Sequence, residues 1–290
     1  MALELTPINE NFGAFASGID ISKDIGQKAK IEIEEAMDEY AVLIWRNSAL
    51  NDDQQLKLAE NFGNVEVSHL SKVRGKGGPD NKSIVPISNI GDDDRFLARD
   101  GRRFGSQIAN QLWHSDSSFM QTVAKYSLLS AREVPDEGGD TQFADLRAAY
   151  DDLPESLKDM TIGLVGHHHA LHSRMLLGLE YTPSEISESP PSNWPLVRVH
   201  PTSERQILFV PIHIRGITGM SDPEARLLVS ELIEHATQHK FCFSHTWQKN
   251  DLVIWDNRCT LHRGRRYGLD ERRILRRITT IENEQRSGRA

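Results

Sequence analysis

A histidine and an aspartate stand two residues apart in the segment 113–116, which reads Trp-His-Ser-Asp. On a β-strand, residues i and i+2 point to the same face, so a short strand over 111–116 would direct His114 and Asp116 toward one point. A second histidine from elsewhere would complete a set of two histidines and one carboxylate. That set covers one face of an octahedral ion and leaves the other positions open, as non-haem Fe(II) oxygenases require.

The C-terminal part of the chain offers the third ligand and a run of arginines. His262 ends an apolar, strand-like stretch, and seven arginines lie between positions 263 and 277 of a chain whose net charge is −8. Strand alternation places Arg273 and Arg277 on one face, where two guanidinium forks suit two separate carboxylates. We interpret the other members of the run as surface salt-bridge residues: Arg263, Arg265, Arg266, Arg272 and Arg276.

A glycine pair precedes a further candidate residue. The segment 138–141 reads Gly-Gly-Asp-Thr. The glycines permit a tight turn, and Thr141 then begins a strand with a hydroxyl donor.

Length and composition limit the class of protein. The 290 residues are 38% hydrophobic and 26% charged, which fits one globular domain over 1–290. The negative net charge argues against a general nucleic-acid or anionic-membrane binder. No run of 18 apolar residues and no secretory signal is present, and Cys242 and Cys259 stand outside any zinc pattern. We expect a cytoplasmic protein with two reduced, buried thiols, and a homo-oligomer.

Periodicity predicts a mainly β fold with helical insertions, either a β-sandwich or a jelly roll. A long surface loop, 71–106, holds one short strand near 84–87 and is a candidate lid. Helices are expected over 27–40, from 51 or 52 to 62, over 145–153 and over 222–238, the last with Asp222 as N-cap and Pro223 at its first position. Strands are expected over 41–45, 111–116, 125–132, 141–144, 162–169, 196–200, 206–211, 241–247, 251–255 and 273–281.

The ordered set of motifs resembles the Fe(II)/2-oxoglutarate-dependent dioxygenases of the taurine dioxygenase group. Within that group the chain is most similar to the 2,4-dichlorophenoxyacetate dioxygenases. Thr141 follows His114 by 27 residues and Arg273 follows His262 by 11, which fits the group's pattern. The matching segments are 110–119, 138–141, 193–198, 255–258, and His262 with the arginine run.

The resemblance implies a double-stranded β-helix, or jelly roll, with Fe(II) bound at one mouth by His114, Asp116 and His262. It assigns Thr141 and Arg273 to the distal carboxylate of the co-substrate 2-oxoglutarate, with O2 as the second co-substrate. The implied reaction oxidises the ether CH2 of an aryloxyalkanoate and gives a phenol and glyoxylate, with succinate and CO2.

The resemblance also implies where the aromatic carboxylate substrate binds. It assigns Arg277 to the acidic head of the substrate, and Asn110, Ser117 and His69 to positions near it. We expect Ile108, Phe119 and the 71–106 loop to supply an apolar wall for the ring.

Three rival interpretations remain open. The same chemistry could act on a sulfonate such as taurine, on an alkyl sulfate or on another aromatic acid, because a sulfonate also suits Arg277. A non-catalytic metal- or sugar-binding cupin would not need the pair of Thr141 and Arg273. A zinc hydrolase is disfavoured because the sequence has no placed general base such as the glutamate of His-Glu-x-x-His.

The remaining histidines and tryptophans have structural interpretations. The histidine tract 167–169 alternates faces on a strand, so we expect a structural role. His172, His200 and His213 could line the pocket, and His213 is expected to be hydrogen-bonded. The helix histidines His235 and His239 are expected to be solvated. The segment 256–258 is expected to fix the turn before His262, and Trp113 and Trp255 are expected in the core.

Overall fold

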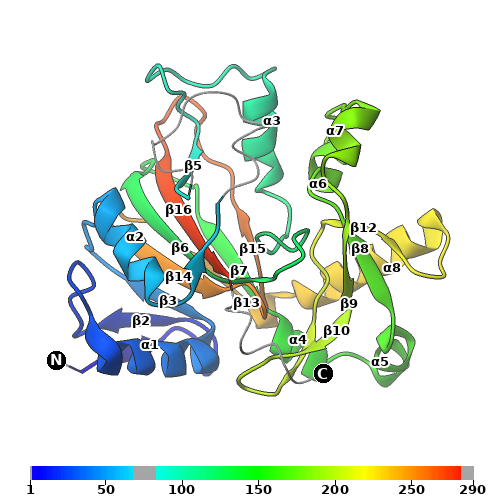
Figure 1. Cartoon of the computed structure of the whole chain (residues 1–290), viewed down its shortest axis with the longest axis horizontal. Helices are drawn as coiled ribbons and strands as arrows, with labels where there is room; N and C mark the ends of the chain where they lie inside the picture. Colours follow the sequence, from blue (N-terminus) through cyan, green and yellow to red (C-terminus); the bar gives the residue numbers. More distant parts are fainter. Residues whose placement is uncertain (1, 68–82, 282–290) are drawn as a thin grey trace.

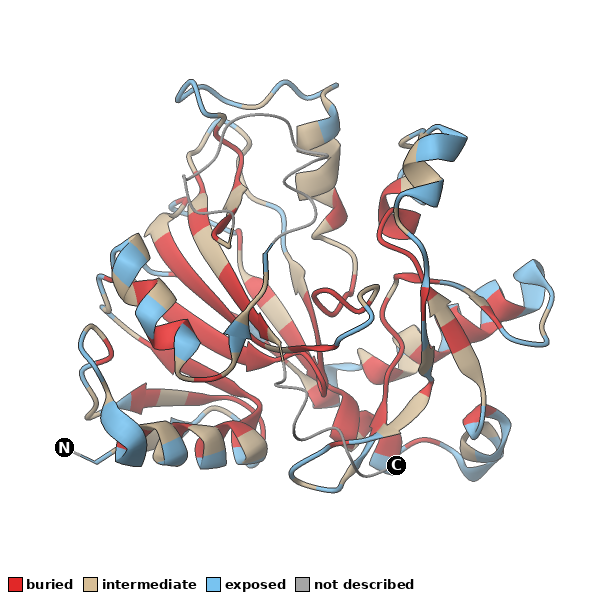
Figure 2. Cartoon of the chain, in the orientation of Figure 1, coloured by how far each residue is buried: buried red, intermediate tan, exposed pale blue. Residues whose placement is uncertain are grey.

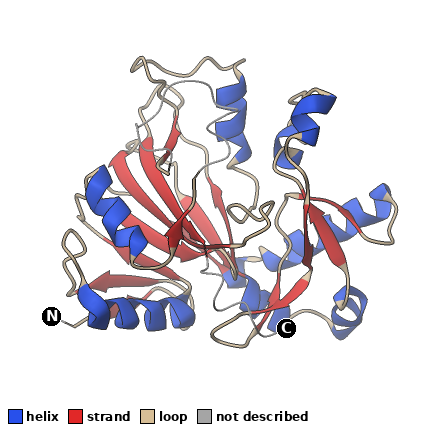
Figure 3. Cartoon of the chain, viewed as in Figure 1, coloured by secondary structure: helices blue, strands red, loops and turns tan. Residues whose placement is uncertain are grey.

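A large antiparallel sheet forms the centre of the molecule (Figures 1 and 3). This computed structural model describes residues 2–67 and 83–281. The strand order is β1-β2-β3-β14-β6-β16-β4, with β5 paired to β16 and with β2 and β3 the parallel neighbours. Its strands are β1 (Glu4–Pro7), β2 (Ala14–Ser17), β3 (Val42–Trp45), β4 (Asn64–Val65), β5 (Val85–Ser88), β6 (Ala124–Glu133), β14 (Leu252–Asp256) and β16 (Ile274–Ile281).

A second, three-stranded sheet packs against the large one. Its order is β13-β7-β15, made by Cys242–His245, Thr141–Asp145 and Thr260–Gly264. Phe143 of β7 contacts Trp255 of β14 with ring centroids 5.6 Å apart. Both side chains belong to one buried apolar cluster that also holds Val253 and Leu261. The core of the site-bearing part therefore lies between these two sheets (Figure 2).

Helices α1 (Gly26–Tyr40) and α2 (Asp52–Glu60) cover the other face of the large sheet (Figure 1). Strand β3 is buried throughout, with Val42 and Ile44 in the inter-sheet cluster and Leu43 in the cluster beneath the helices. That alternation follows from the two-residue period of a strand. It explains why the sequence of β3 is uniformly apolar, since both of its faces are covered.

Local sequence explains where these helices end and begin. Helix α1 stops at Ala41, whose φ of 58° is left-handed. Helix α2 begins with a capping box. The Asn51 side chain accepts from the Gln54 backbone amide, and the Gln54 side chain accepts from the Asn51 backbone amide. Gln55 of α2 is fully buried and donates to the carbonyls of Leu128 and Arg276. Helix α2 is therefore hydrogen-bonded directly to β6 and to β16, the strand that carries Arg277.

A smaller unit lies beside the sheets (Figure 1). It contains the sheet β12-β8-β9 and the hairpin β10-β11. Its strands are β8 (Val165–His168), β9 (Ser192–Pro195), β10 (Val197–Val199), β11 (Gln206–Leu208) and β12 (Ile214–Ile217).

The remaining helices of the described chain are α3 (Arg102–Ala109), α4 (Leu146–Asp151), α5 (Glu155–Thr161), α6 (His172–Met175), α7 (Pro183–Ser187), α8 (Asp222–Ala236) and the 3₁₀ turn η2 (His239–Phe241). No helix in the described ranges has the length and apolarity that a membrane span needs.

The mainly β prediction with helical insertions is confirmed, and the long periodic elements lie where they were expected. The predicted strand over 111–116 is wrong. His114 makes one isolated bridge and Asp116 opens a turn. The described part of the 71–106 loop contains β5 as expected, but helix α3 also begins in it. Helix α3 was missed, as were α5, α6 and α7. Residues 68–82 of that loop lie outside the described residues. The N-cap of α8 is Ser221, one residue before the predicted Asp222.

The histidine tract has the structural place that was expected for it. His167 bonds Asn193 across the strand pair at 2.6 Å. His168 is fully buried and stacks on Phe209 at 5.4 Å, and neither of its ring nitrogens has a hydrogen-bond partner among the described residues. Burial, and next the nearby Arg198 guanidinium, lower the pKa of His168 to about 3.

This burial makes His168 a source of acid sensitivity. The unfolded chain takes up a proton near pH 6.5 while the folded chain does not until about pH 3, so stability falls as the pH drops through that window. His168→Leu should reduce the slope of the unfolding free energy against pH by up to about 1.4 kcal/mol per pH unit between these values. Urea denaturation at several pH values measures the slope, and equal slopes in both proteins would refute the assignment.

Candidate active site

His114 and His262 are brought together by a backbone bridge. His262 lies on β15, and His114 lies in the loop between α3 and β6. Each amide donates to the other's carbonyl, at 3.0 Å from His114 and 2.8 Å from His262. The two ring centroids are 4.1 Å apart. These two backbone hydrogen bonds, and not the predicted strand over 111–116, therefore place His114 beside His262.

Asp116 is placed by a buried asparagine and a buried serine. The Asp116 amide donates to Asn257 Oδ1 at 3.2 Å, and Trp255 Nε1 donates to the same oxygen at 2.9 Å. Asn257 Nδ2 donates to Ser127 Oγ, which in turn donates to Asp116 Oδ2 at 2.7 Å. The turn that follows β14 therefore fixes both the backbone and one oxygen of the carboxylate.

The three side chains present a ligand set for one ion. The three ligand atoms lie within 4.8 Å of one another, and all three residues are buried. His114 Nε2 is 4.0 Å from Asp116 Oδ1, and His262 Nε2 is 3.8 Å from Asp116 Oδ2. These separations are too long for hydrogen bonds, but they fit atoms that each lie about 2.0–2.2 Å from a shared metal.

Protonation in the cluster suits metal binding. Burial lowers the pKa of His114, and burial followed by the neighbouring His114 lowers the pKa of His262. Burial alone would raise the pKa of Asp116, but the Arg277 guanidinium and the two histidines outweigh it and hold that pKa below its usual value. His114 Nδ1 lies 2.7 Å from the Leu112 carbonyl, which places the ring proton on Nδ1 and leaves a lone pair on Nε2. Neutral imidazoles and an ionised carboxylate are the forms that bind metal.

Two cavities meet at this cluster. The larger has a volume of about 420 Å³ and the smaller about 30 Å³, and His114, Asn110 and Arg277 line both. Further residues of the larger cavity are Ile87, Asn89, Phe104, Gln107, Ile108, Gln111, Leu129, Thr141, Trp255, His262, Gly264, Arg265, Arg266, Tyr267, Leu269 and Arg273. The candidate metal position thus lies between a roomy chamber and a narrow recess.

Arg273 and Thr141 both line the larger cavity and offer hydrogen-bond donors to an anion. Arg273 is buried and donates through Nη2 to the Gly139 carbonyl at 3.0 Å, and its Nε has no partner among the described residues. The ion pairs of the described chain include none to Arg273. Thr141 Oγ1 accepts from Trp247 Nε1 at 3.0 Å, which leaves the hydroxyl proton for a ligand. A buried guanidinium without a carboxylate is a binding site for one.

The glycine pair lies beside Arg273. Gly138 and Gly139 both have left-handed backbone, with φ of 76° and 70°. A Cβ on Gly138 would lie 2.5 Å from the Arg266 carbonyl oxygen, and one on Gly139 would lie 3.1 Å from Arg273 Nε. Both glycines adopt the left-handed backbone that glycine permits, and their missing Cβ atoms make room for the Arg266 carbonyl and the Arg273 side chain.

Arg277 lies on β16, four residues beyond Arg273, which immediately precedes that strand. Its Nη1 contacts Asp116 Oδ1 directly. The carboxylate thus pairs with an arginine in the structure, and an ion would compete with that pairing. Arg277 Nε has no hydrogen-bond partner among the described residues, which leaves further donor capacity in the guanidinium.

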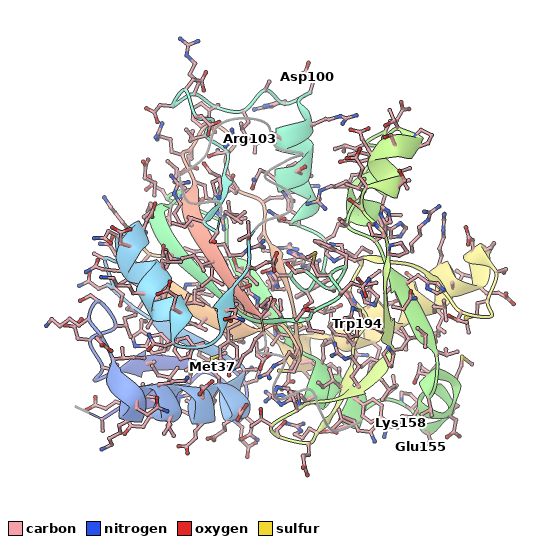
Figure 4. The ribbon with its side chains drawn as sticks, viewed as in Figure 1. Met37, Asp100, Arg103, Glu155, Lys158 and Trp194 are labelled. Atoms are coloured by element: carbon pink, nitrogen blue, oxygen red, sulfur yellow. The ribbon has the colours of Figure 1, made fainter. Side chains whose placement is uncertain are left out.

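The smaller cavity contains most of the residues that were expected near substrate. It is lined by Ala109, Asn110, His114, Asp116, Ser117, Phe119, Ser173, Arg174, His213 and Arg277. Ser117 has a left-handed φ of 53°, a strained conformation next to a ligand residue. His213 is hydrogen-bonded, with Nδ1 3.0 Å from Ser118 Oγ, and also lines the recess. Trp194, labelled in Figure 4, donates to the Ser118 carbonyl and anchors this loop to β9.

Other expected site residues have mixed outcomes. His69 lies outside the described residues. Ile108 lines the larger cavity and Phe119 the smaller. His172 and His200 are absent from the described linings of these two cavities, and His200 instead contacts Asp256 at 3.1 Å. Trp255 is buried as expected, and it also contacts His262 with ring centroids 4.6 Å apart.

The interpretation of the other arginines holds only in part. Arg272 pairs with Glu133 and Asp94 as a surface salt bridge, as predicted. Arg263 instead lies over the Trp113 ring at 4.5 Å, where it makes a cation–π contact. Arg265 and Arg266 are exposed, but both line the larger cavity. Alternation over the predicted strand 273–281 grouped Arg273 with Arg277, whereas it carries no information on Arg265 and Arg266, which lie between β15 and β16.

A second buried cluster supports the turn before His262. The carboxylate of Asp256 accepts from Arg258 and lies 3.1 Å from His200 Nε2, and Arg258 also donates its amide to Asp256 Oδ1. Burial would raise the pKa of Asp256, but the Arg258 guanidinium and His200 hold it well below its usual range. His200, Asp256 and Cys259 could group around a metal by distance. Both oxygens of Asp256 already accept from Arg258, and burial raises the pKa of the Cys259 thiol, so the predicted turn-fixing role explains the cluster.

Sequence reasoning missed three contributors: Ser127, Trp247 and Arg174. Ser127 and Trp247 each act through one hydrogen bond, from Ser127 to Asp116 across 11 positions of sequence and from Trp247 to Thr141 across 106. Arg174 lines the smaller cavity from a four-residue helix. None of the three carries a local motif, so only the tertiary structure identifies them.

The Asn257 contacts predict a positioning role in metal binding. Asn257→Ala should weaken Mn(II) binding about 10- to 100-fold, the usual cost of removing a group that orients a ligand. Anaerobic calorimetric titration with Mn(II) measures the affinity, and Asn193→Ala, at an exposed position of β9, serves as the control. Unchanged affinity in a folded Asn257→Ala protein would show that Asp116 is held by other means.

Comparison with known proteins places this geometry in a family. The chain is 45% identical over 284 residues to an alpha-ketoglutarate-dependent 2,4-dichlorophenoxyacetate dioxygenase of Cupriavidus pinatubonensis, covering 98% of this chain and 99% of the relative. It is 33% identical to an (S)-phenoxypropionate/alpha-ketoglutarate-dioxygenase of Sphingobium herbicidovorans, covering 94% and 93%.

A solved structure gives the same result. The crystal structure of AAD-2 in complex with Mn(II) and N-oxalylglycine superimposes with a TM-score of 0.90 at 40% identity, over the full length of both chains. The family model described as taurine catabolism dioxygenase TauD, TfdA family, matches residues 4–279. The chain therefore belongs to the TauD/TfdA family of 2-oxoglutarate-dependent dioxygenases.

Proposed function

We propose that this enzyme uses Fe(II), 2-oxoglutarate and O2 to oxidise an aryloxyacetate such as 2,4-dichlorophenoxyacetate at its ether CH2. The observation that carries the proposal is the placement of two arginines beside one His-Asp-His cluster. Arg273 lies at the end of the larger cavity, and Arg277 lies where the two cavities meet. The 45% identity to a 2,4-dichlorophenoxyacetate dioxygenase over nearly the whole chain supports the choice of substrate.

In this proposal His114, Asp116 and His262 hold the iron. Their buried, neutral or anionic donor atoms fit Fe(II) and would leave positions open for other ligands. Fe(II) with bound 2-oxoglutarate supplies the oxidative decarboxylation that activates O2 toward a C–H bond. The protein contributes the orientation of the reactants and the exclusion of water from the buried cluster.

Arg273 and Thr141 would bind the distal carboxylate of 2-oxoglutarate. A guanidinium fork and a hydroxyl donor can together satisfy one carboxylate. Trp247 Nε1 donates a hydrogen bond to Thr141 Oγ1. The guanidinium carbon of Arg273 lies 5.5 Å from the centre of the Tyr267 ring. This end of the cavity therefore has its donors oriented before the ligand arrives.

Arg277 would bind the carboxylate of the primary substrate. The ether CH2 is one bond from that carboxylate, so holding the acid beside the cluster brings the reacting carbon to it. Hydroxylation of this carbon gives a hemiacetal, and cleavage of its C–O bond releases a phenol and glyoxylate. The apolar side chains of Phe104, Ile108 and Leu269 would form the wall against the aromatic ring.

We infer that the two packed sheets form the double-stranded β-helix that the sequence resemblance implied. Sheet β13-β7-β15 faces the large sheet across the Phe143 and Trp255 contact, and the candidate ligands lie at one end of this sandwich. The likeness to AAD-2 supports the same architecture.

We also propose a single catalytic domain, because the family match extends over residues 4–279. The free thiols of Cys242 and Cys259 support the proposed cytoplasmic location, although Cys242 is only half-buried. The expected homo-oligomer stays a prediction that sedimentation velocity would test.

Turnover of a substrate panel tests the proposal. With Fe(II), 2-oxoglutarate and O2, 2,4-dichlorophenoxyacetate should yield 2,4-dichlorophenol, glyoxylate and succinate in equal amounts. His114→Ala should abolish the reaction because one ligand is lost. Oxygen consumption and chromatography of the products provide the readout. If taurine or an alkyl sulfate accelerates 2-oxoglutarate consumption and no aryloxyalkanoate does, the substrate assignment is wrong.

Arg277→Met should separate substrate binding from co-substrate chemistry. Removing a charged hydrogen-bonding group from the substrate's acid should raise KM for the aryloxyacetate about 10- to 100-fold. The slow consumption of 2-oxoglutarate without primary substrate should persist, because Arg273 and Thr141 are intact. An equal loss of both activities would contradict the division of roles between the two arginines.

A further inference from the structure

The smaller cavity contains a second buried arginine that the proposed reaction does not yet use. Arg174 lies on α6 and is 6% exposed. Its Nη1 donates to the Ala170 carbonyl at 2.7 Å and to Ser173 Oγ at 3.3 Å. No hydrogen bond from Nε or Nη2 and no ion pair joins Arg174 to another residue in the described parts of the chain. Three of its five N–H groups are therefore available to a ligand.

The position of Arg174 indicates which ligand its free N–H groups could bind. Arg174 and Arg277 both line the smaller cavity, which also reaches His114 and Asp116. Its volume of about 30 Å³ has room for a carboxylate-sized group and not for an aromatic ring. The recess therefore suits the polar head of a substrate whose ring lies in the larger cavity.

The net charge of the residues that line the recess also favours an anionic ligand. Its described lining holds two guanidinium cations, Arg174 and Arg277, and one carboxylate, Asp116. With the histidines neutral, the lining residues carry a net charge of +1. One monoanionic substrate head would complete the balance, and an uncompensated buried charge is costly.

We propose that Arg174 is a second binding residue for the substrate's anionic head, so that Arg174 and Arg277 hold it from two elements, α6 and β16. This inference rests on the proposed function, since it extends the substrate site already described. Two guanidinium groups on separate elements fix the position of an acid more firmly than one, because each restricts a different direction of movement. Arg174 thereby contributes to the selection of anionic over neutral aryl ethers.

A purely structural role for Arg174 makes a different prediction. The bonds to Ala170 and Ser173 lie within four residues of Arg174, and they use Nη1 alone. If the side chain only braced α6, its loss would lower thermal stability without changing the affinity for acids. The two roles are therefore separated by ligand affinity in variants that remain folded.

Binding of 2,4-dichlorophenoxyacetate to the protein loaded with Mn(II) and N-oxalylglycine provides the test. Isothermal titration calorimetry should show that Arg174→Met and Arg174→Gln each weaken binding about 10- to 100-fold, with partial recovery in Arg174→Lys. Arg205→Met removes an arginine from the exposed pair with Asp151 and should bind as the wild type does. Circular dichroism melting identifies folded variants, and the Gln variant retains a donor for the Ala170 carbonyl if the Met variant fails to fold.

The same experiment distinguishes failure of this inference from failure of the proposed function. If the wild type binds another acid, such as an alkyl sulfate, in place of the aryloxyacetate, the substrate proposal fails and the variants are compared with that acid. If a folded neutral variant binds the wild type's acid within about twofold of the wild-type affinity, Arg174 does not contact the substrate. A parallel tenfold loss of affinity for N-oxalylglycine would likewise overturn the assignment, because it would place Arg174 at the co-substrate.

Discussion

The buried carboxylate of Asp116 is the group on which the rest of the site depends. A carboxylate removed from water needs charge and hydrogen-bond partners, and here they come from four parts of the chain. Ser127 on β6 and Asn257 after β14 fix its geometry, Arg277 on β16 supplies a positive charge, and His262 on β15 completes the ligand set with His114. Both packed sheets must therefore be formed before the cluster exists.

The arginines around this cluster explain how one metal position could serve two acids. Arg273 lies beyond the cluster in the larger cavity, while Arg174 and Arg277 line the smaller recess. In the proposed function, separate arginines would bind the two carboxylates, so the co-substrate and the substrate would not compete for one guanidinium. The left-handed backbone at Gly138 and Gly139 makes room for Arg273, and helix α6 carries Arg174. The positions of both arginines therefore depend on short local structures outside the sheets.

The sequence predicted the parts of this arrangement that depend on local period. The same-face relation of Arg273 and Arg277 followed from strand alternation, and the apolar runs located β3, β6, β7, β14 and β16. The placement of His114 and Asp116 was proposed for the wrong reason, because a bridge and a turn, not a strand, bring them together. Arg174, Ser127 and Trp247 could not be predicted, since their roles depend on contacts between segments that are distant in sequence. Helix α3 was missed because its residues lie in a charged, glycine-containing stretch without a long apolar period.

The central claim is that the His-Asp-His cluster holds Fe(II) beside 2-oxoglutarate and a separate acid. Anaerobic absorption spectroscopy of the full-length protein tests it most directly. Adding 2-oxoglutarate to the Fe(II)-loaded protein should produce a visible charge-transfer band, and 2,4-dichlorophenoxyacetate should then shift it. The absence of a band at saturating Fe(II) and 2-oxoglutarate would contradict the account and favour a non-catalytic metal-binding protein.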